Sequence, residues 1–161
     1  MIPYILDRGY TKIDYIVISH FDSDHSLGCA KILENMDVSA IILSEQFEEN
    51  DIYKQIVAMA NKKNIKLIYV KVGNVLNIDC VRLSILHPQK ELMVNNVMNN
   101  NSIVCKIEYQ SFSCLFTGDI EQEAEELILN KNINLKADVL KVAHHRLKNI
   151  YIIRIFKSCL S

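Results

Sequence analysis

The first half of the chain alternates short apolar runs with amphipathic stretches. Residues 15–19 form a β-branched, apolar run that is typical of a strand buried on both faces. Residues 27–36 then place apolar side chains at helical spacing, and residues 51–63 repeat this pattern. Further strands are predicted at residues 38–43 and 65–72. The order strand–helix–strand–helix–strand favours a parallel sheet with right-handed crossovers.

The second half changes to closely spaced strands. They are predicted at residues 75–78, 81–86, 103–109 and 112–116. The gaps between them are short, which favours antiparallel pairing. Other elements expected from the pattern are helices at 2–9 and 120–129, a loop at the asparagine-rich residues 95–101, and a short last strand at 139–143. Periodicity and composition alone therefore predict one α/β domain.

Composition limits the class of protein further. The 161 residues are half apolar, which is enough to bury the core of one domain, and the formal net charge is only −1. That charge gives no global attraction to nucleic acid, and no basic stripe interleaved with aromatic residues suggests a groove for single-stranded DNA. No apolar run reaches the roughly 20 residues of a membrane span, and the start lacks the pattern of a signal peptide. We therefore expect a soluble chain without a signal peptide or transmembrane segment.

One cluster of polar residues stands out at the end of the first predicted strand. His20, Asp22, Asp24 and His25 place two imidazoles and two carboxylates within six positions. Mixed nitrogen and oxygen ligands of this kind suit Zn²⁺, Mn²⁺ or iron, and His20, Asp22 and Asp24 can converge on one ion from an extended or turning segment. A second ion could be held by Asp24 and His25. The alternative is a polar turn with Asp24 or Ser26 as the cap of the next helix, but a cap needs only one oxygen.

This cluster resembles the His-x-His-x-Asp-His signature of the metallo-β-lactamase superfamily, with Asp22 in place of the second histidine. The variant His-x-Asp-x-Asp-His is similar to that of the hydrolase domain of ComEC-type competence proteins, which take up DNA. Later segments resemble the family in the same order along the chain, namely residues 86–88 (Leu-His-Pro), 99–104 (Asn-Asn-Asn-Ser-Ile-Val), 115–119 (Leu-Phe-Thr-Gly-Asp) and 137–145 (ending Ala-His-His).

The resemblance implies an αββα metallo-β-lactamase-like sandwich that is incomplete at both ends. Residues 1–145 would form this partial domain, because the opening strands of the family are missing. Residues 146–161 form an atypical tail in which Arg146 stands where the family has a glycine. We interpret the chain as a fragment with a late start and a frameshift after His145.

The resemblance also implies a function, a metal-dependent hydrolase that cleaves phosphodiester bonds and has DNA as its substrate. Two divalent ions, Zn or Mn, would lie about 4 Å apart and activate water. Asp24 would be both a ligand and the catalytic proton acceptor. The implied metal ligands are His20, Asp22, Asp24, His25, Asp119, His144 and His145. Two alternatives stay open at this point: an inactive fragment of such a protein, or a standalone hydrolase of a small ester or phosphate compound. Members of the resembled family are attached to the cell membrane with this domain outside, and the oligomeric state stays open.

Several single residues allow two interpretations. Asp119 follows a glycine and could cap the next helix, whereas the resemblance makes it a bridge between two metals. His144 and His145 are neighbours at a strand end and should point in opposite directions, so at most one faces a given metal. His87 could be a further ligand or a satisfied histidine at the rim. Asp138 could orient one of the paired histidines or simply flank the strand.

Overall fold

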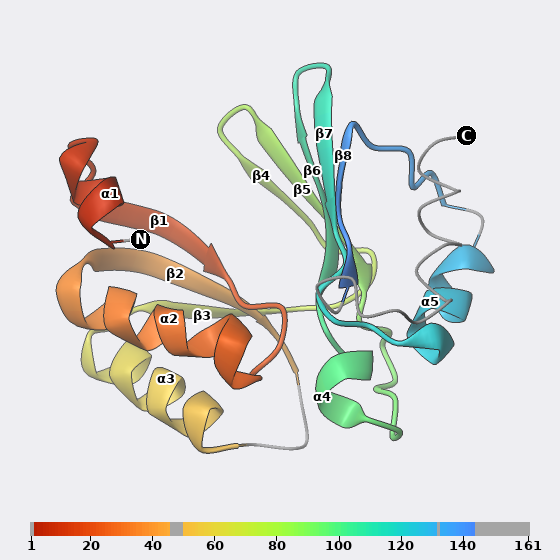
Figure 1. Ribbon diagram of the computed structural model, residues 1–161, viewed down its shortest axis with the longest axis horizontal. Helices are drawn as coiled ribbons and strands as arrows, with labels where there is room; N and C mark the ends of the chain where they lie inside the picture. Colours follow the sequence, from red (N-terminus) through yellow and green to blue (C-terminus); the bar gives the residue numbers. More distant parts are fainter. Residues whose placement is uncertain (1, 46–49, 132, 144–161) are drawn as a thin grey trace.

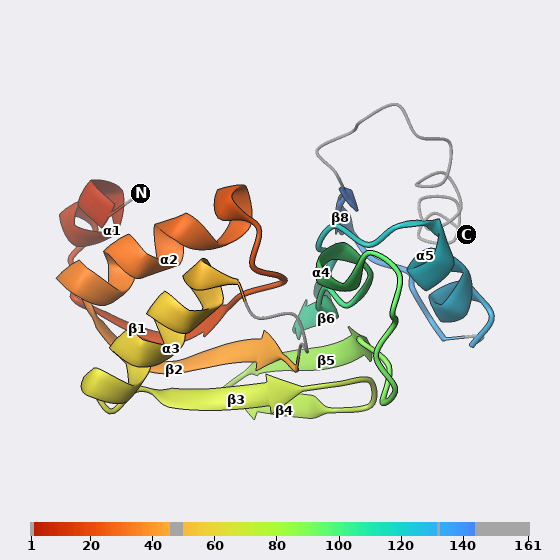
Figure 2. The same ribbon diagram turned by 90° about the horizontal axis from the view of Figure 1, so that it is seen from below.

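The computed structural model describes residues 2–45, 50–131 and 133–143, and its first half is a parallel sheet covered by helices. The three strands of this sheet pair in the order β1-β2-β3. Its elements are α1 (Ile2–Asp7), β1 (Lys12–Val17), α2 (Ser23–Asn35), β2 (Asp37–Ser44), α3 (Asp51–Lys62) and β3 (Lys66–Val70). Figures 1 and 2 show α1, α2 and α3 on the same face of the sheet. The predicted strand–helix alternation is confirmed.

The second half is a five-stranded sheet in the order β4-β5-β6-β7-β8. Its strands are β4 (Val75–Ile78), β5 (Val81–His87), β6 (Val104–Tyr109), β7 (Phe112–Phe116) and β8 (Val139–Lys141). The first four pair antiparallel, as predicted, while β8 runs parallel to β7 after the crossover through α5 (Gln122–Leu129). The short helix α4 (Val97–Asn100) lies between β5 and β6.

Three apolar clusters stack these elements into four layers. One cluster joins α2 and α3 to the outer face of the first sheet, through residues such as Leu33 and Ile56. A second joins the two sheets, with Ile42 of β2 against Ile85 and Ile103. A third packs α5 against the far face of the second sheet. The architecture is therefore the αββα sandwich that the resemblance implied.

The structure corrects three local expectations. The first strand is not buried on both faces, because β1 is an edge strand in which Tyr15 is 40% and Val17 38% exposed. Residues 95–101 are not a plain loop, because α4 forms there after Asn96, which adopts a left-handed backbone conformation (φ 41°). The buried Asn101 amide binds both the N–H and the carbonyl of Met93 and holds this segment in place. Helix α2 also begins at Ser23, four residues before the predicted start. Asp24 and His25 therefore lie in its first helical turn and not in an extended segment.

Among the residues that the structure describes, no helix has the length and apolar character needed to cross a membrane.

Candidate metal centre

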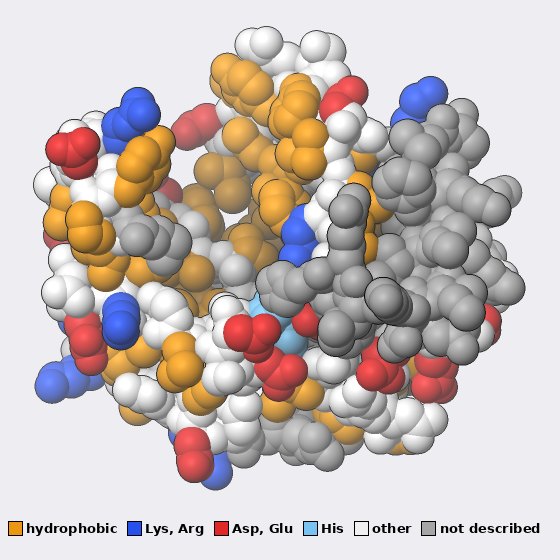
Figure 3. Space-filling view, in the orientation of Figure 1, with side chains coloured by type: hydrophobic (Ala, Val, Ile, Leu, Met, Phe, Trp, Pro, Cys, Tyr) orange, Lys and Arg blue, Asp and Glu red, His pale blue; other side chains and the backbone are white. Residues whose placement is uncertain are grey.

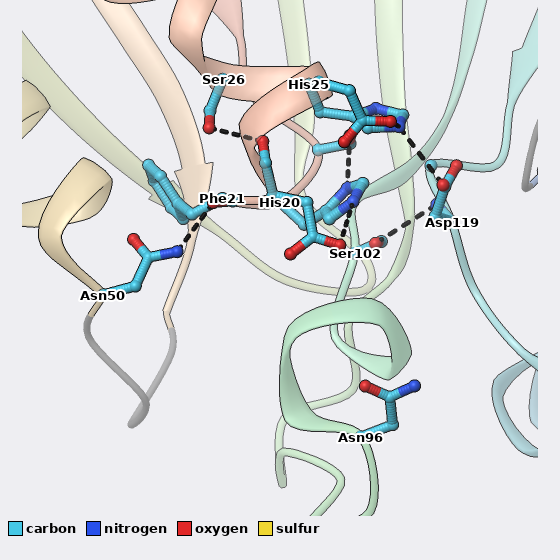
Figure 4. A network of polar contacts seen from close by, with 12 residues as sticks. His20, Phe21, His25, Ser26, Asn50, Asn96, Ser102 and Asp119 are labelled. Carbon is cyan, nitrogen blue, oxygen red and sulfur yellow. Dashed lines mark hydrogen bonds and ion pairs between the residues drawn. The ribbon is translucent and has the colours of Figure 1, made fainter.

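The loop between β1 and α2 is anchored on both sides of His20, by Ile18 before it and by Phe21 after it. Its first residue, Ile18, extends the parallel pairing by donating its N–H to the carbonyl of Ile42 (2.9 Å). Phe21 is buried and meets the ring of Tyr53 edge-on, with 5.0 Å between centroids. The side chain of Asn50, which caps α3, donates to the carbonyl of Phe21 (2.7 Å), as Figure 4 shows. The backbone around His20 is thus held by the sheet, the core and a neighbouring helix.

His20 is completely buried and has one ring nitrogen without a hydrogen-bond partner among the described residues. Its Nδ1 lies 3.0 Å from the hydroxyl of Ser19, and a proton on Nδ1 would be donated to that oxygen. Its Nε2 makes no hydrogen bond, although Oδ2 of Asp22 is 3.5 Å away. A buried polar nitrogen without a partner is costly unless a ligand satisfies it. Nε2 therefore has the geometry of a metal ligand whose ring is oriented by an outer hydrogen bond.

The protonation state of His20 fits this role. Burial, and to a lesser extent the neighbouring His25, lowers its pKa from 6.5 to about 4, against smaller opposite effects of Asp119, Asp22 and Asp24. The imidazole is therefore neutral at pH 7, so no proton competes with a metal for the Nε2 lone pair.

His25 reaches the same point from the first turn of α2. Its ring centroid is 4.2 Å from that of His20. Its Nε2 lies 3.2 Å from Oδ2 of Asp119 and 3.5 Å from Oδ2 of Asp24. Figure 4 shows the two rings and the Asp119 carboxylate turned toward one another.

Asp119 is carried to the site by the turn that follows β7. Gly118 in this turn has φ +55°, and a Cβ built on it would lie 2.6 Å from the Cβ of Ser102. Glycine is therefore required both for the backbone conformation and for the close approach to Ser102. The hydroxyl of Ser102 accepts from the N–H of Asp119 (3.3 Å), and Nζ of Lys141 lies 3.0 Å from Oδ1 of Asp119. Asp119 does not cap α5, whose N-cap residue is Glu121.

The structure thus brings together three predicted ligands from segments far apart in the sequence. Each of His20, His25 and Asp119 offers one ligand atom, and these atoms all lie within 4.8 Å of one another. The 3.2 Å between His25 and Asp119 is close to the roughly 3.4 Å that separates two ligands of a tetrahedral zinc ion. With the unsatisfied Nε2 of His20, this set of two nitrogens and one oxygen fits a divalent metal ion.

Asp22 and Asp24 border this cluster. Asp22 occupies the N-cap position of α2, yet its side chain makes no capping hydrogen bond and instead faces His20. Neither Asp24 nor Ser26 is the cap residue, contrary to the simpler of the two interpretations. The Asp24 side chain is 62% exposed, so water reaches it while it stays beside His25. His144 and His145 lie outside the described residues, and their proposed part in the centre stays a prediction.

A cleft between the two sheets opens beside the centre. Its volume is about 270 Å³, and its walls include Val17 and Phe116 together with His25 and Lys141. Figure 3 shows histidine side chains at the bottom of the hollow between the two halves of the molecule, next to acidic side chains. A substrate can therefore approach the cluster from solvent through this cleft.

Both ring nitrogens of His87 have hydrogen-bond partners, and His87 is not a member of the His20–His25–Asp119 cluster. It is completely buried, and its Nε2 lies 2.6 Å from the carbonyl of Asn100, which can only accept. The Nε2 therefore carries the proton, and Nδ1 accepts from the amide of Gln89 (3.3 Å). Asp138 has a structural contact as well, since its Oδ2 accepts from the N–H (2.7 Å) and the hydroxyl (3.0 Å) of Ser113. Those hydrogen bonds lower the pKa of Asp138.

Comparison with known proteins identifies the family. A family model described as the metallo-beta-lactamase superfamily matches residues 2–157. The chain belongs to the metallo-β-lactamase superfamily. Within this superfamily it is 30% identical over 145 residues to "ComE operon protein 3" of Bacillus subtilis (strain 168). The alignment covers 90% of this chain but only 18% of that relative, so the chain spans less than a fifth of its length. The expected resemblance to ComE-type competence proteins is confirmed.

Solved structures share the metallo-β-lactamase fold with this chain at low identity. Igni18, a metallo hydrolase from the archaeon Ignicoccus hospitalis KIN4/I, superposes with a TM-score of 0.57 at 14% identity, over 91% of this chain and 59% of that one. Unliganded yeast PDE1 gives 0.55 at 16% identity, over 91% and 52%. CmlA, a diiron β-hydroxylase from Streptomyces venezuelae, gives 0.56 at 14% identity, over 83% and 26%. These similarities establish the fold.

Sequence reasoning assigned no role to two residues that the structure places at the centre. Lys141 was expected only as part of the last strand, but its ammonium contacts Asp119. Ser19 was expected only as the last residue of the strand predicted at 15–19, but its hydroxyl contacts the ring of His20. A polar residue at the end of an apolar strand was the available signal for Ser19. For Lys141 the signal was a cation within an otherwise apolar strand.

Proposed function

We propose that this chain is a metal-dependent hydrolase that cleaves phosphodiester bonds and acts on DNA. The observation that carries the proposal is the convergence of His20, His25 and Asp119 on one point at the end of an open cleft. Nitrogen and carboxylate ligands in this combination suit Zn²⁺ or Mn²⁺. We assign Asp22 and Asp24, which border the cluster, as further ligands, together with one of His144 and His145.

DNA as the substrate is supported by the similarity to ComE operon protein 3, because ComE-type competence proteins take up DNA. The chain itself carries no general attraction for DNA, with a formal net charge of −1. Recognition must therefore depend on local groups at the cleft and not on a long-range field.

Most of the reaction can be assigned to side chains of this chain. A bound divalent ion would supply a Lewis acid for a phosphoryl oxygen and lower the pKa of water toward 7. His20 is neutral, and Ser19 orients its ring. Its Nε2 lone pair is therefore available to the metal ion and is not occupied by a proton. Asp24 is exposed to water and lies beside His25. Its carboxylate would accept the proton of the attacking water.

The experiment that tests this proposal is the Asp24→Ala variant. We expect cleavage of single-stranded DNA and of bis(p-nitrophenyl) phosphate in Mn²⁺ or Zn²⁺ to fall by about 10²- to 10⁴-fold, the usual contribution of a general base. Circular dichroism should show an unchanged fold, because Asp24 is exposed at the start of α2.

The matched control is Asp14→Ala, which removes a similarly exposed aspartate in β1 that pairs with Lys12 at 3.2 Å. It should leave both rates unchanged. Equal rates for Asp24→Ala and the wild type would contradict the assignment. Hydrolysis of a lactone but of neither phosphodiester would show a hydrolase with a different substrate.

A further inference from the structure

We propose that Lys141 supplies the second positive charge of this centre, so that one divalent ion and one ammonium group, instead of two ions, bind the substrate phosphate. The inference rests on the proposed function and names the groups that would hold the phosphodiester. It differs from the two-metal centre expected from the sequence.

The first observation is the position of the Lys141 ammonium. Nζ donates to the carbonyl of Gly118 (2.9 Å) and to Oδ1 of Asp119 (3.0 Å). An ammonium group has three N–H donors, and among the described residues these are its two hydrogen-bond acceptors. The side chain is 33% exposed and lines the same cleft as His25. The third N–H can therefore be donated to a ligand in the cleft.

The second observation is how the two oxygens of Asp119 are used. Oδ2 lies 3.2 Å from Nε2 of His25, within the three-residue cluster, whereas Oδ1 lies 3.0 Å from the ammonium of Lys141. A carboxylate that bridges two dications through both of its oxygens directs one oxygen to each of them. Here the second oxygen already has a cation, and a dication at that position would be repelled by the ammonium.

The third observation is that Lys141 is held firmly in this place. β8 pairs parallel with β7, and Lys141 lies opposite Phe116 in that register. The hydroxyl of Thr117 donates to the carbonyl of Lys141 (2.9 Å). Both ends of the contact therefore come from adjacent strands, since Gly118 and Asp119 directly follow β7. The ammonium is positioned by the fold and is not a mobile surface charge.

These contacts predict what Lys141 does with substrate. A lysine ammonium is a compact point charge that binds phosphate oxygens. Next to the metal ligands, it would bind one non-bridging oxygen of the phosphodiester while the ion binds another. Lys141 is thus a substrate-binding residue, and its loss should raise KM.

The test measures metal stoichiometry and kinetics on the full chain. Calorimetric titration with Mn²⁺, with elemental analysis after gel filtration, should give one ion per wild-type chain. Lys141→Asp should bind two, because the ammonium is replaced by a carboxylate ligand. Lys141→Met should still bind one ion, with KM for bis(p-nitrophenyl) phosphate raised at least tenfold. Lys136→Met, which removes an exposed lysine upstream of β8, should match the wild type.

The outcomes separate this inference from the proposed function. Two Mn²⁺ ions per wild-type chain would overturn the role of Lys141 and leave a phosphodiesterase with two metals. An unchanged KM in Lys141→Met would overturn it as well. A wild-type chain that binds no Mn²⁺ would overturn the proposed function and this inference together. The wild-type stoichiometry needs no variant, so the inference can be tested even if a substituted chain fails to fold.

Discussion

Two histidines of this chain are neutral for the same physical reason but are used differently. Burial lowers the pKa of both His20 and His87 to about 4. In His87 both ring nitrogens have protein partners, so the residue completes a buried hydrogen-bond network. In His20 only Nδ1 has a hydrogen-bond partner among the described residues, and Nε2 lies in the cluster with His25 and Asp119. The number of satisfied nitrogens separates the structural histidine from the candidate ligand.

The contact between Ser19 and His20 leads to a prediction on metal affinity. Ser19→Ala removes the oxygen that orients the ring, so Mn²⁺ or Zn²⁺ affinity should fall by about 10- to 100-fold, the usual effect of losing such an outer contact. Calorimetry measures this change. Ser23→Ala, at an exposed position of α2, is the control and should bind metal like the wild type. Equal affinities in both variants would show that Ser19 does not orient the ligand.

His87 leads to a prediction on the pH dependence of stability. Its pKa is about 4 in the folded chain and 6.5 when unfolded, so the unfolded chain binds more protons between these values. The stability that depends on neutral His87 is complete above pH 6.5 and is lost as the pH falls toward 4, by about 3 kcal/mol.

Urea denaturation at pH 7 and pH 4 measures this effect. His87→Gln keeps a donor for the carbonyl of Asn100 but cannot titrate, so its free energy of unfolding should fall about 3 kcal/mol less than that of the wild type. The same pH dependence in both chains would contradict the assignment of a neutral buried His87.

At the scale of elements, turns and helix starts determine where the candidate ligands lie. Asp119 follows β7 through the tight turn at Gly118, and His25 sits in the first turn of α2. The candidate ligands thus lie on short segments that directly follow strands, and the strands fix the backbone of these segments. Small backbone changes in these segments should therefore move a ligand.

Gly118 gives the sharpest prediction at this scale. Gly118→Ala adds a Cβ at 2.6 Å from that of Ser102 and forces alanine to φ +55°, so it should destabilise the chain by at least about 1 kcal/mol and weaken metal binding. Gly28→Ala is the control, because among the described residues no atom outside the adjacent backbone of helix α2 lies within 4 Å of the added methyl group. It should stabilise the chain by about 0.5–1 kcal/mol and leave metal affinity unchanged. Urea denaturation and calorimetry compare the two variants.

Periodicity predicted the strands and long helices because their apolar faces are regular. It missed α4, since asparagine is a poor helix former and the helix is held by tertiary contacts such as those of Asn101. It also placed the start of α2 too late, because residues 23–26 are mostly polar and show no apolar period. Local pattern cannot reveal an element that is stabilised from elsewhere in the chain.

At the scale of the whole molecule, the packing of the two sheets forms the site. His20 and His25 belong to the half built on the first sheet, whereas Asp119 and Lys141 belong to the second. The apolar cluster that includes Ile42, Ile85 and Ile103 joins these halves. The distance between the ligands therefore depends on this shared core.

Ile42→Ala tests this dependence. The side chain is completely buried between the sheets, so its truncation should lower the free energy of unfolding by about 2–5 kcal/mol. Val94→Ala, at a side chain that is 76% exposed, should change it by less than about 0.5 kcal/mol. Urea denaturation compares the two. A loss below 1 kcal/mol for Ile42→Ala would mean that the sheets are not held by this cluster.

The sequence predicted the identity of the residues at the centre better than it predicted their arrangement in space. The residue types and the order of the motifs along the chain indicated His20, His25 and Asp119 as ligands. The structure brings these three residues together. The division of the Asp119 oxygens between His25 and Lys141 could not be predicted, because it depends on the register of β8 against β7. Such distances arise only when both sheets are in place.

The most direct test of the central claim is anomalous diffraction at the manganese edge from crystals of the chain grown with Mn²⁺. We predict a single strong peak within coordination distance of Nε2 of His20, with His25 and Asp119 also as ligands. A chain whose anomalous peaks all lie away from these three residues, or that shows none, would contradict the account.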